Sequence, residues 1–195
     1  MPHGRRRKPV AFGRQLALLT VCALIVPAQL YLALPLGPFL EDAFRISPAA
    51  ASWATSAFAL AYAFGFLFFG PWSERVGRRR VLTGGMVGLA ITTAGASLAP
   101  NLAVLIIFRV TQGLMAATLA PVALIWVTEK APARLRSRAL AILTTGLLGA
   151  GLMGQVYGTG MLAVVSWRWM LMTAAGAYLL LAWLLHESIE EGHDG

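Results

Sequence analysis

Six apolar stretches recur along this chain, and each is long enough to cross about 30 Å of bilayer hydrocarbon as a helix. We place them, to within several residues, at 16–37, 52–71, 81–99, 103–126, 139–163 and 168–186. The connections between them are too short to build a soluble domain. The stretches therefore predict an all-α membrane protein: a six-transmembrane-helix bundle over 16–186, a basic N-terminal segment over 1–15 and an acidic tail over 187–195.

Composition supports this fold class. Of the 195 residues, 58% are hydrophobic and 12% are charged, whereas a soluble domain carries about 25% charged residues. This balance excludes a disordered chain, a collagen and a coiled coil. Cys22 is the single cysteine of the sequence, and the three histidines lie at or beyond the edges of the apolar stretches. We therefore expect no metal site and no bound cofactor.

Lysine and arginine are unevenly divided between alternate connections. The formal net charge of +8 raises nucleic acid as a partner. However, thirteen of the 16 basic residues share one side of the predicted topology: Arg5, Arg6, Arg7, Lys8, Arg14, Arg75, Arg78, Arg79, Arg80, Lys130, Arg134, Arg136 and Arg138. Because loops rich in Lys and Arg stay in the cytoplasm, this bias predicts that both termini are cytoplasmic. It also indicates the lipid bilayer, and not nucleic acid, as the partner.

The connection between the second and third stretches reads Gly70-Pro-Trp-Ser-Glu-Arg-Val-Gly-Arg-Arg-Arg80. Gly70 permits close approach of two helices, and Gly77 permits a tight turn with positive φ. Glu74 can accept hydrogen bonds from Arg75, from Arg78 or from backbone N–H groups at a helix start. Taken by itself, the segment is also explained as a basic cytoplasmic loop with a turn.

Three motifs in order along the chain resemble those of one family, the major facilitator superfamily. Its signature between spans 2 and 3 is similar to Gly70, Glu74, Arg75, Gly77, Arg78, Arg79 and Arg80, with Glu74 where the family usually has Asp. Its fourth-span motif resembles Arg109-x-x-Gln112-Gly113-x-x-Ala116-Ala117, and the sixth span of its drug exporters opens like Ser166-Trp167-Arg168-Trp169. The resemblance implies half of a major facilitator fold, built as 3+3 inverted repeats.

The same resemblance implies a function. We expect a secondary transporter of small organic solutes in a bacterial plasma membrane, with efflux as the direction. Uptake of a sugar or another metabolite is the alternative. Gln155 stands where the family's antiporters carry a proline in span 5, and this difference counts against drug antiport. The loop around Gly77 is expected to bias one conformational state without touching solute. Gly113, Gly154 and Gly158 predict close helix packing.

Arg109 is the one charged residue inside a predicted span. At 1.5 Å per residue it lies roughly 9 Å below the outer end of that span, while Gln29, Gln112 and Gln155 lie about 12–14 Å below the outer ends of theirs. We therefore expect these four side chains to form one polar face that lines a solute pathway. Outward snorkelling of Arg109 is the alternative explanation.

All eight acidic residues lie in loops, at span ends or in the tail. A proton relay needs ionisable groups within the membrane. The sequence therefore contains no candidate proton carrier, and coupling to protons stays open.

An intramembrane protease and a non-transporting subunit are the other function classes that the sequence suggests. Ser97 and His186 resemble the dyad of rhomboid-type intramembrane proteases, but they lie roughly 20 Å apart along the membrane normal, whereas a dyad needs about 3 Å. We therefore expect no enzyme. Transporters of the family have two six-span halves, so the expected partner is the C-terminal six-span half or a second copy of this chain. A non-transporting half-size membrane subunit is the remaining alternative.

Overall fold

The computed structural model describes residues 9–189, with side chains from Phe12 onward. Residues 1–8 and 190–195, which include most of the predicted basic segment and acidic tail, lie outside the described range. Within that range the chain is helical and contains no strand. The helices are α1 (Pro9–Ile25), α2 (Ala28–Tyr31), α3 (Ala33–Phe44), α4 (Pro48–Val76), α5 (Arg78–Ser97), α6 (Leu102–Ala116), α7 (Leu119–Lys130), the 3₁₀ turn η1 (Ala133–Leu135), α8 (Arg136–Leu162) and α9 (Trp167–Ser188).

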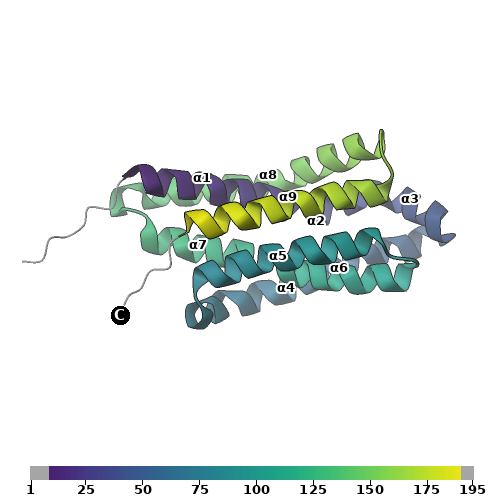
Figure 1. Ribbon diagram of the computed structural model, residues 1–195, viewed down its shortest axis with the longest axis horizontal. Coiled ribbons are helices and arrows are strands. Elements are labelled where there is room, and N and C mark those ends of the chain that lie inside the picture. Colours follow the sequence, from purple (N-terminus) through teal and green to yellow (C-terminus); the bar gives the residue numbers. More distant parts are fainter. Residues whose placement is uncertain (1–8, 190–195) are drawn as a thin grey trace, which may run out of the picture.

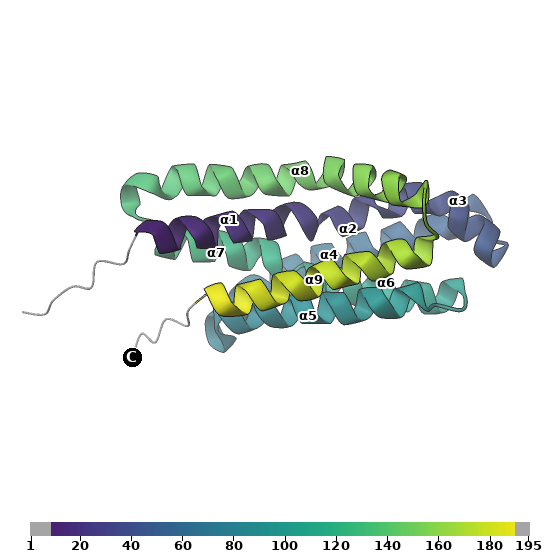
Figure 2. The ribbon, with the colours of Figure 1, turned by 45° about the horizontal axis from the view of Figure 1, so that its top comes forward.

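These helices form six spans that run alternately up and down one elongated bundle (Figure 1). Span 1 comprises α1 to α3, span 4 comprises α6 and α7, and each other span is one helix. We call the end that carries Gly77 and η1 the basic end, and the end that carries the 98–101 connection the opposite end. Figure 2 shows α8 running alongside α1 and α2, with α3 extending beyond the end of α8.

Five of the six spans are long and apolar enough to cross a membrane by length and composition alone. The exception is α5, which opens with three arginines and contains four glycines in its 20 residues. It nevertheless lies within the bundle, packed along α9 on one side and α6 on the other (Figure 1). The six-helix bundle predicted from the sequence is therefore confirmed.

The second three spans repeat the first three at an interval of 89 residues. α5 begins at Arg78 and α9 begins at Trp167, which gives that interval directly. The packing repeats as well, since span 2 packs on span 4 as span 5 packs on span 1, while spans 3 and 6 pack on each other. Because equivalent helices run in opposite directions, the two repeats are inverted, as transporter repeats commonly are.

Prolines account for the interruptions in spans 1 and 4. A proline has no N–H to donate to the carbonyl four residues before it, and its ring clashes with that carbonyl. Pro27 and Pro35 accordingly flank the one-turn helix α2, and Pro121 lies just after the break between α6 and α7. Both interruptions fall within the length of the bundle, away from its ends.

The connections that follow spans 1 and 2 are shorter than expected. The predicted loop 72–80 reduces to Gly77, because α4 continues to Val76 and α5 starts at Arg78. Glu41 and Asp42, which lie beyond the predicted end of span 1, are likewise helical. The reason is that a helix does not have to end where the apolar stretch ends, since its last turns can extend into the polar headgroup region.

Candidate functional site

Arg109 lies in the interior of the bundle, on α6, with 2% of its surface exposed. Its Nε donates to the carbonyl oxygen of Ala54 at 2.8 Å, and its Nη2 donates to the carbonyl oxygen of Gln29 at 3.2 Å. Its Nη1 donates to Oε1 of Gln112 at 3.1 Å. The guanidinium carbon lies 4.5 Å from the centre of the Phe58 ring, a cation–π distance. Every nitrogen of the guanidinium therefore has an acceptor.

Two more side chains extend this arrangement. Nε2 of Gln112 donates to Oγ1 of Thr93 on α5 at 3.0 Å, and the hydroxyl of Tyr178 on α9 donates to Oε1 of Gln29 on α2 at 2.9 Å. All of these side chains are buried. We call Gln29, Thr93, Arg109, Gln112 and Tyr178 the Arg109 network. With the carbonyl of Ala54 it connects spans 1, 2, 3, 4 and 6.

No carboxylate pairs with Arg109 in the part of the chain that the structure describes. A buried charge costs several kcal/mol unless its donors are satisfied (about 3–5 kcal/mol when a partner is removed). Here backbone carbonyl groups supply two of the three acceptors, one of them from α2 inside the interruption of span 1. Nε2 of Gln29 is buried without a hydrogen-bond partner in the described chain.

The structure does not bring together all four side chains of the expected polar face. Gln29, Arg109 and Gln112 come together, but inside the bundle, and Gln155 is exposed on α8 outside this network. Successive residues of a helix point about 100° apart, so Gly154, which faces span 1, turns its neighbour Gln155 away. Arg109 does not snorkel outward either, because its acceptors lie on neighbouring helices. That these residues line a solute pathway stays a prediction.

Thr93, Tyr178 and Phe58 were not predicted from the sequence. The predicted site consisted of charged and amide side chains within the spans, whereas neutral hydroxyl groups complete this network. A usable signal was present, since Thr93 and Tyr178 are hydroxyl-bearing residues well inside their spans. A buried hydroxyl in an apolar helix requires a hydrogen-bond partner.

The three glycines predicted to pack closely each face a neighbouring backbone or ring. A Cβ at Gly113 on α6 would collide with the carbonyl oxygen of Phe58 on α4. A Cβ at Gly154 would collide with the carbonyl oxygen of Ala28, and one at Gly158 would lie 2.8 Å from Cγ of Pro35. Span 4 therefore packs on span 2, and span 5 on span 1, at distances that only glycine allows.

The turn between α4 and α5 is organised by Gly77 and Arg78. Gly77 ends α4 and precedes α5 with φ 99° and ψ 130°, a conformation that disfavours any side chain. Arg78 forms an ion pair with Glu129 near the end of α7, and not with Glu74. The turn is thus tied to span 4, which the sequence did not indicate.

The other residues of this motif lie around the turn. Gly70 is buried on α4, and a Cβ there would lie 3.7 Å from Cβ of Pro121, an ordinary contact. Glu74, Arg75 and Arg80 are exposed. They therefore face the surroundings of the basic end and lie far along the bundle from the Arg109 network.

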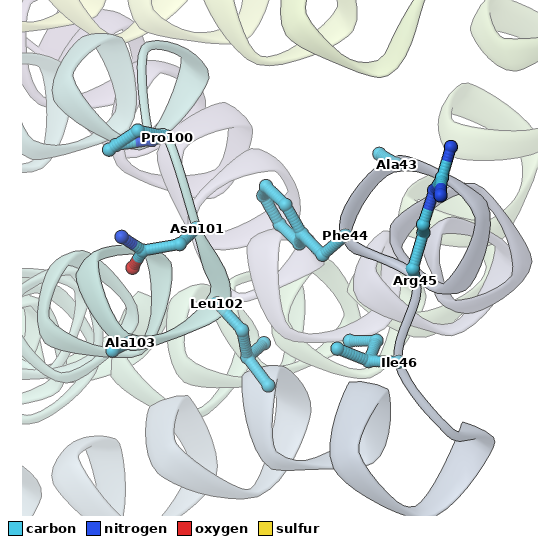
Figure 3. A pocket seen from close by; sticks show the side chains of 8 residues that line it. All are labelled: Ala43, Phe44, Arg45, Ile46, Pro100, Asn101, Leu102 and Ala103. Carbon is cyan, nitrogen blue, oxygen red and sulfur yellow. The ribbon is translucent and has the colours of Figure 1, made fainter.

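A hollow of about 510 Å³ opens at the opposite end (Figure 3). Residues 43–46, at the end of α3, form one wall and residues 100–103, at the start of α6, form the other, with Phe44 and Leu102 directed into the space between them. The side chain of Asn101 caps α6 by accepting from the backbone N–H of Val104 at 3.0 Å. Because its walls are mostly apolar and backbone groups, the hollow shows no chemistry for a specific ligand.

The protease-like dyad weighed from the sequence is not assembled in the described chain. Ser97 ends α5 at the opposite end, and His186 lies near the basic end of α9, so they do not meet. Within residues 12–189 no cluster of His, Cys, Asp and Glu could hold a metal ion.

Comparison with known proteins gives matches to one family. The model of the Major Facilitator Superfamily matches residues 19–193. The chain is 31% identical over 162 residues to the MFS-type transporter YceJ of Bacillus subtilis (strain 168) and 31% identical over 182 residues to the galactose-proton symporter of Escherichia coli (strain K12). It is 36% identical over 132 residues to the cephamycin export protein CmcT of Amycolatopsis lactamdurans.

These alignments cover 80%, 86% and 67% of this chain but only 40%, 36% and 27% of the three relatives, in the same order. The chain therefore spans two fifths or less of their length. A crystal structure of a bacterial homolog of the human lysosomal transporter Spinster, inward-facing and unoccupied, superposes with a TM-score of 0.82 at 21% identity. That match covers 97% of this chain and 45% of the other, and at this identity it establishes the fold alone.

Proposed function

This chain belongs to the major facilitator superfamily, and from that premise we propose that it forms one half of a secondary transporter that exports a small organic solute across a bacterial plasma membrane. The family and the relatives are membrane transporters and not enzymes.

The observation that carries the proposal is the Arg109 network. It ties the interruption of span 1 to span 4, which is itself interrupted, through Gln29 and Arg109. Transporters built from inverted repeats place their solute sites beside such interrupted helices, near the middle of the membrane. We assign the network the role of holding spans 1 and 4 in register, so that the wall of the pathway keeps its shape.

The side chains proposed to touch solute are Gln155 and Tyr31. Both are exposed, and the Tyr31 ring lies 3.6 Å from where a Cβ of Gly151 would be. Gln155 follows Gly151 by four residues on α8, and we propose that the amide and the ring contact different parts of the same solute. An aromatic ring beside an amide suits a solute with an apolar body and a few polar groups.

Export is supported by the likeness to CmcT, whose name describes cephamycin export, and by the exporter-like segment Trp167-Arg168-Trp169. Uptake of a sugar or metabolite is the second candidate, and the likeness to a galactose-proton symporter favours it. For orientation, we propose that the basic end faces the cytoplasm, because Arg134, Arg136 and Arg138 are all exposed there.

We further propose that a second six-span half, or a second copy of this chain, completes the pathway. Large apolar side chains are exposed on α4 and α8, among them Leu60, Phe64, Leu148 and Leu152, and either lipid or a partner half covers such surfaces. The described acidic residues lie at the ends of the spans. Any proton coupling would therefore use groups of the partner half. A non-transporting subunit is the outcome if no partner confers transport.

The test is transport by the complete protein in lipid vesicles, loaded or bathed with a panel of small organic solutes. Export predicts solute movement out of the compartment that contacts the basic end, and uptake predicts the reverse. Replacing Gln155 by Ala should raise KM about 3- to 10-fold with turnover nearly unchanged, the loss of one hydrogen bond. Leu152→Ala, on the same helix and 73% exposed, is the matched control. No transport of any solute would refute the function, and an unchanged KM would refute the role of Gln155.

A further inference from the structure

Arg79 and Arg168 occupy equivalent positions in the two inverted repeats. They are 89 residues apart, and each is the second residue of its helix, α5 or α9. Each side chain reaches from the start of its own helix to the end of the other. Nη2 of Arg79 donates to the carbonyl oxygen of His186 at 2.6 Å, and Nη1 of Arg168 donates to the carbonyl oxygen of Ser97 at 2.6 Å.

The acceptors obey the same relation as the donors. Ser97 and His186 are also 89 residues apart, so the second contact is the first one carried over to the other repeat. The two contacts lie at opposite ends of the antiparallel pair formed by α5 and α9. The same interaction therefore occurs twice, once at each end of the bundle.

The chemistry of a helix end explains why arginine is used. The last four carbonyl groups of a helix accept no hydrogen bond from within that helix and carry a partial negative charge. Near lipid, water cannot be relied on to satisfy them. A guanidinium carries a positive charge and presents several N–H donors in a planar fork. The ammonium group of lysine has no such fork. Each helix thus receives its C-terminal cap from the first turn of its partner.

The contact at Arg168 is the stronger of the two. Its Nη2 also donates to the carbonyl oxygen of Ala99 at 3.1 Å, and its guanidinium carbon lies 4.4 Å from the centre of the Trp167 ring. Arg79 makes one such bond, and its Nε is buried without a partner in the described chain. Loss of Arg168 should therefore have the larger effect.

We propose that Arg79 and Arg168 are a reciprocal pair of clamps that hold spans 3 and 6 together as one rigid antiparallel unit. Both of these spans are single unbroken helices, whereas spans 1 and 4 are interrupted. Bending within the bundle is therefore left to the interrupted spans. The clamps act independently of the solute and of the direction of transport. Arg168, in the segment Trp167-Arg168-Trp169, thereby has a role that involves no solute.

The experiment measures the distance between α5 and α9 at each end separately, by spin labelling of the complete protein in lipid discs. Labels on Gly84→Cys and Trp183→Cys report on the basic end, and labels on Leu98→Cys and Trp169→Cys report on the opposite end. All four positions are exposed, and nothing lies within 4 Å of a Cβ at Gly84. The buried Cys22 is replaced by Ala so that the labels are unique.

Arg79→Gln should broaden the distance distribution at the basic end at least about twofold and leave the opposite end unchanged, because a helix end opens locally. Arg168→Gln should broaden the distribution at the opposite end and leave the basic end unchanged. It should also lower the thermal midpoint by about 2–4 °C. Arg168→Lys, which keeps the charge without the fork, should give intermediate broadening. If the Arg168→Gln protein does not accumulate in cells, the Arg168→Lys protein is used to test the clamp at this end.

Two exposed arginines serve as matched controls, Arg75→Gln at the basic end and Arg45→Gln at the opposite end. Neither should broaden either distribution. Equal broadening at both ends from one clamp variant would mean general destabilisation and would overturn the proposal. So would distributions that stay narrow in both clamp variants.

Discussion

The guanidinium of Arg109 is held in an apolar bundle by carbonyl oxygens, an amide and an aromatic ring, and not by a carboxylate within the described chain. This arrangement removes the need for a second buried charge, whose desolvation would cost further free energy. It also makes the site depend on backbone positions. Any shift of α2 or α4 relative to α6 changes the acceptors that Arg109 can reach.

Replacing Arg109 by Met should lower the free energy of unfolding by about 3–5 kcal/mol, because the buried carbonyl of Ala54 and the amide of Gln112 lose their donor. Arg109→Lys should recover only part of this, since lysine lacks the planar fork. The measurement is the thermal midpoint of the purified protein. Arg138→Met, at an exposed position, is the control and should leave it unchanged. A midpoint equally unaffected in Arg109→Met would contradict the structural role.

Glycine substitutions on α8 separate packing from helix propensity. Gly154→Ala places a methyl group against the carbonyl oxygen of Ala28 and 2.9 Å from Cβ of Tyr31, so we expect a loss of about 1–3 kcal/mol. Gly160→Ala, with nothing within 4 Å, should instead gain up to about 1 kcal/mol from helix propensity. Unfolding midpoints of the two variants in one detergent make the comparison. Opposite signs are expected, and a gain in both would show that α8 can move away from span 1.

At the scale of the elements, the inverted repeat differs between its copies at the turn after the second span. Gly77 and Arg78 make a one-residue connection tied to α7 by the ion pair with Glu129. The equivalent connection before α9, residues 163–166, is longer and apolar. The charged turn therefore belongs to one end only, and its role in biasing one conformational state stays a prediction.

Reversing the charge in Arg78→Glu should lower turnover of the complete transporter about two- to fivefold, the range of a partly exposed ion pair, with little change in solute affinity. Glu129→Arg added to it should restore turnover, because the pair is remade with opposite signs. Gly77→Val should also lower turnover, since valine resists φ 99°. Weakened solute binding at unchanged turnover would show that the turn belongs to the binding site.

At the scale of the whole molecule, the division of charge between the two ends gives the bundle a direction. The basic end carries the exposed arginines of η1 and the start of α8, while Arg45 and Arg168 lie at the opposite end. The apolar spans lie between these ends. This division of charge supports the proposal that the basic end faces the cytoplasm.

Single cysteines at Ser47→Cys and Arg136→Cys test this orientation in intact cells. A membrane-impermeant thiol reagent should label position 47 and spare position 136, and both should react after permeabilisation. Both positions are exposed, while Cys22 is buried and should not react in the parent protein. Labelling of position 136 from outside, with protection at 47, would reverse the proposed topology.

The family, the six spans and the close approach at Gly113, Gly154 and Gly158 could be predicted from the sequence, because span length, charge bias and small residues act through local composition. The tertiary structure alone decided which side Gln155 faces, since one residue of helix rotation separates a packed position from an exposed one. It also decided the acceptors of Arg109 and the reciprocal contacts of Arg79 and Arg168. Those acceptors are backbone carbonyls, which every residue carries, so only the fold selects among them.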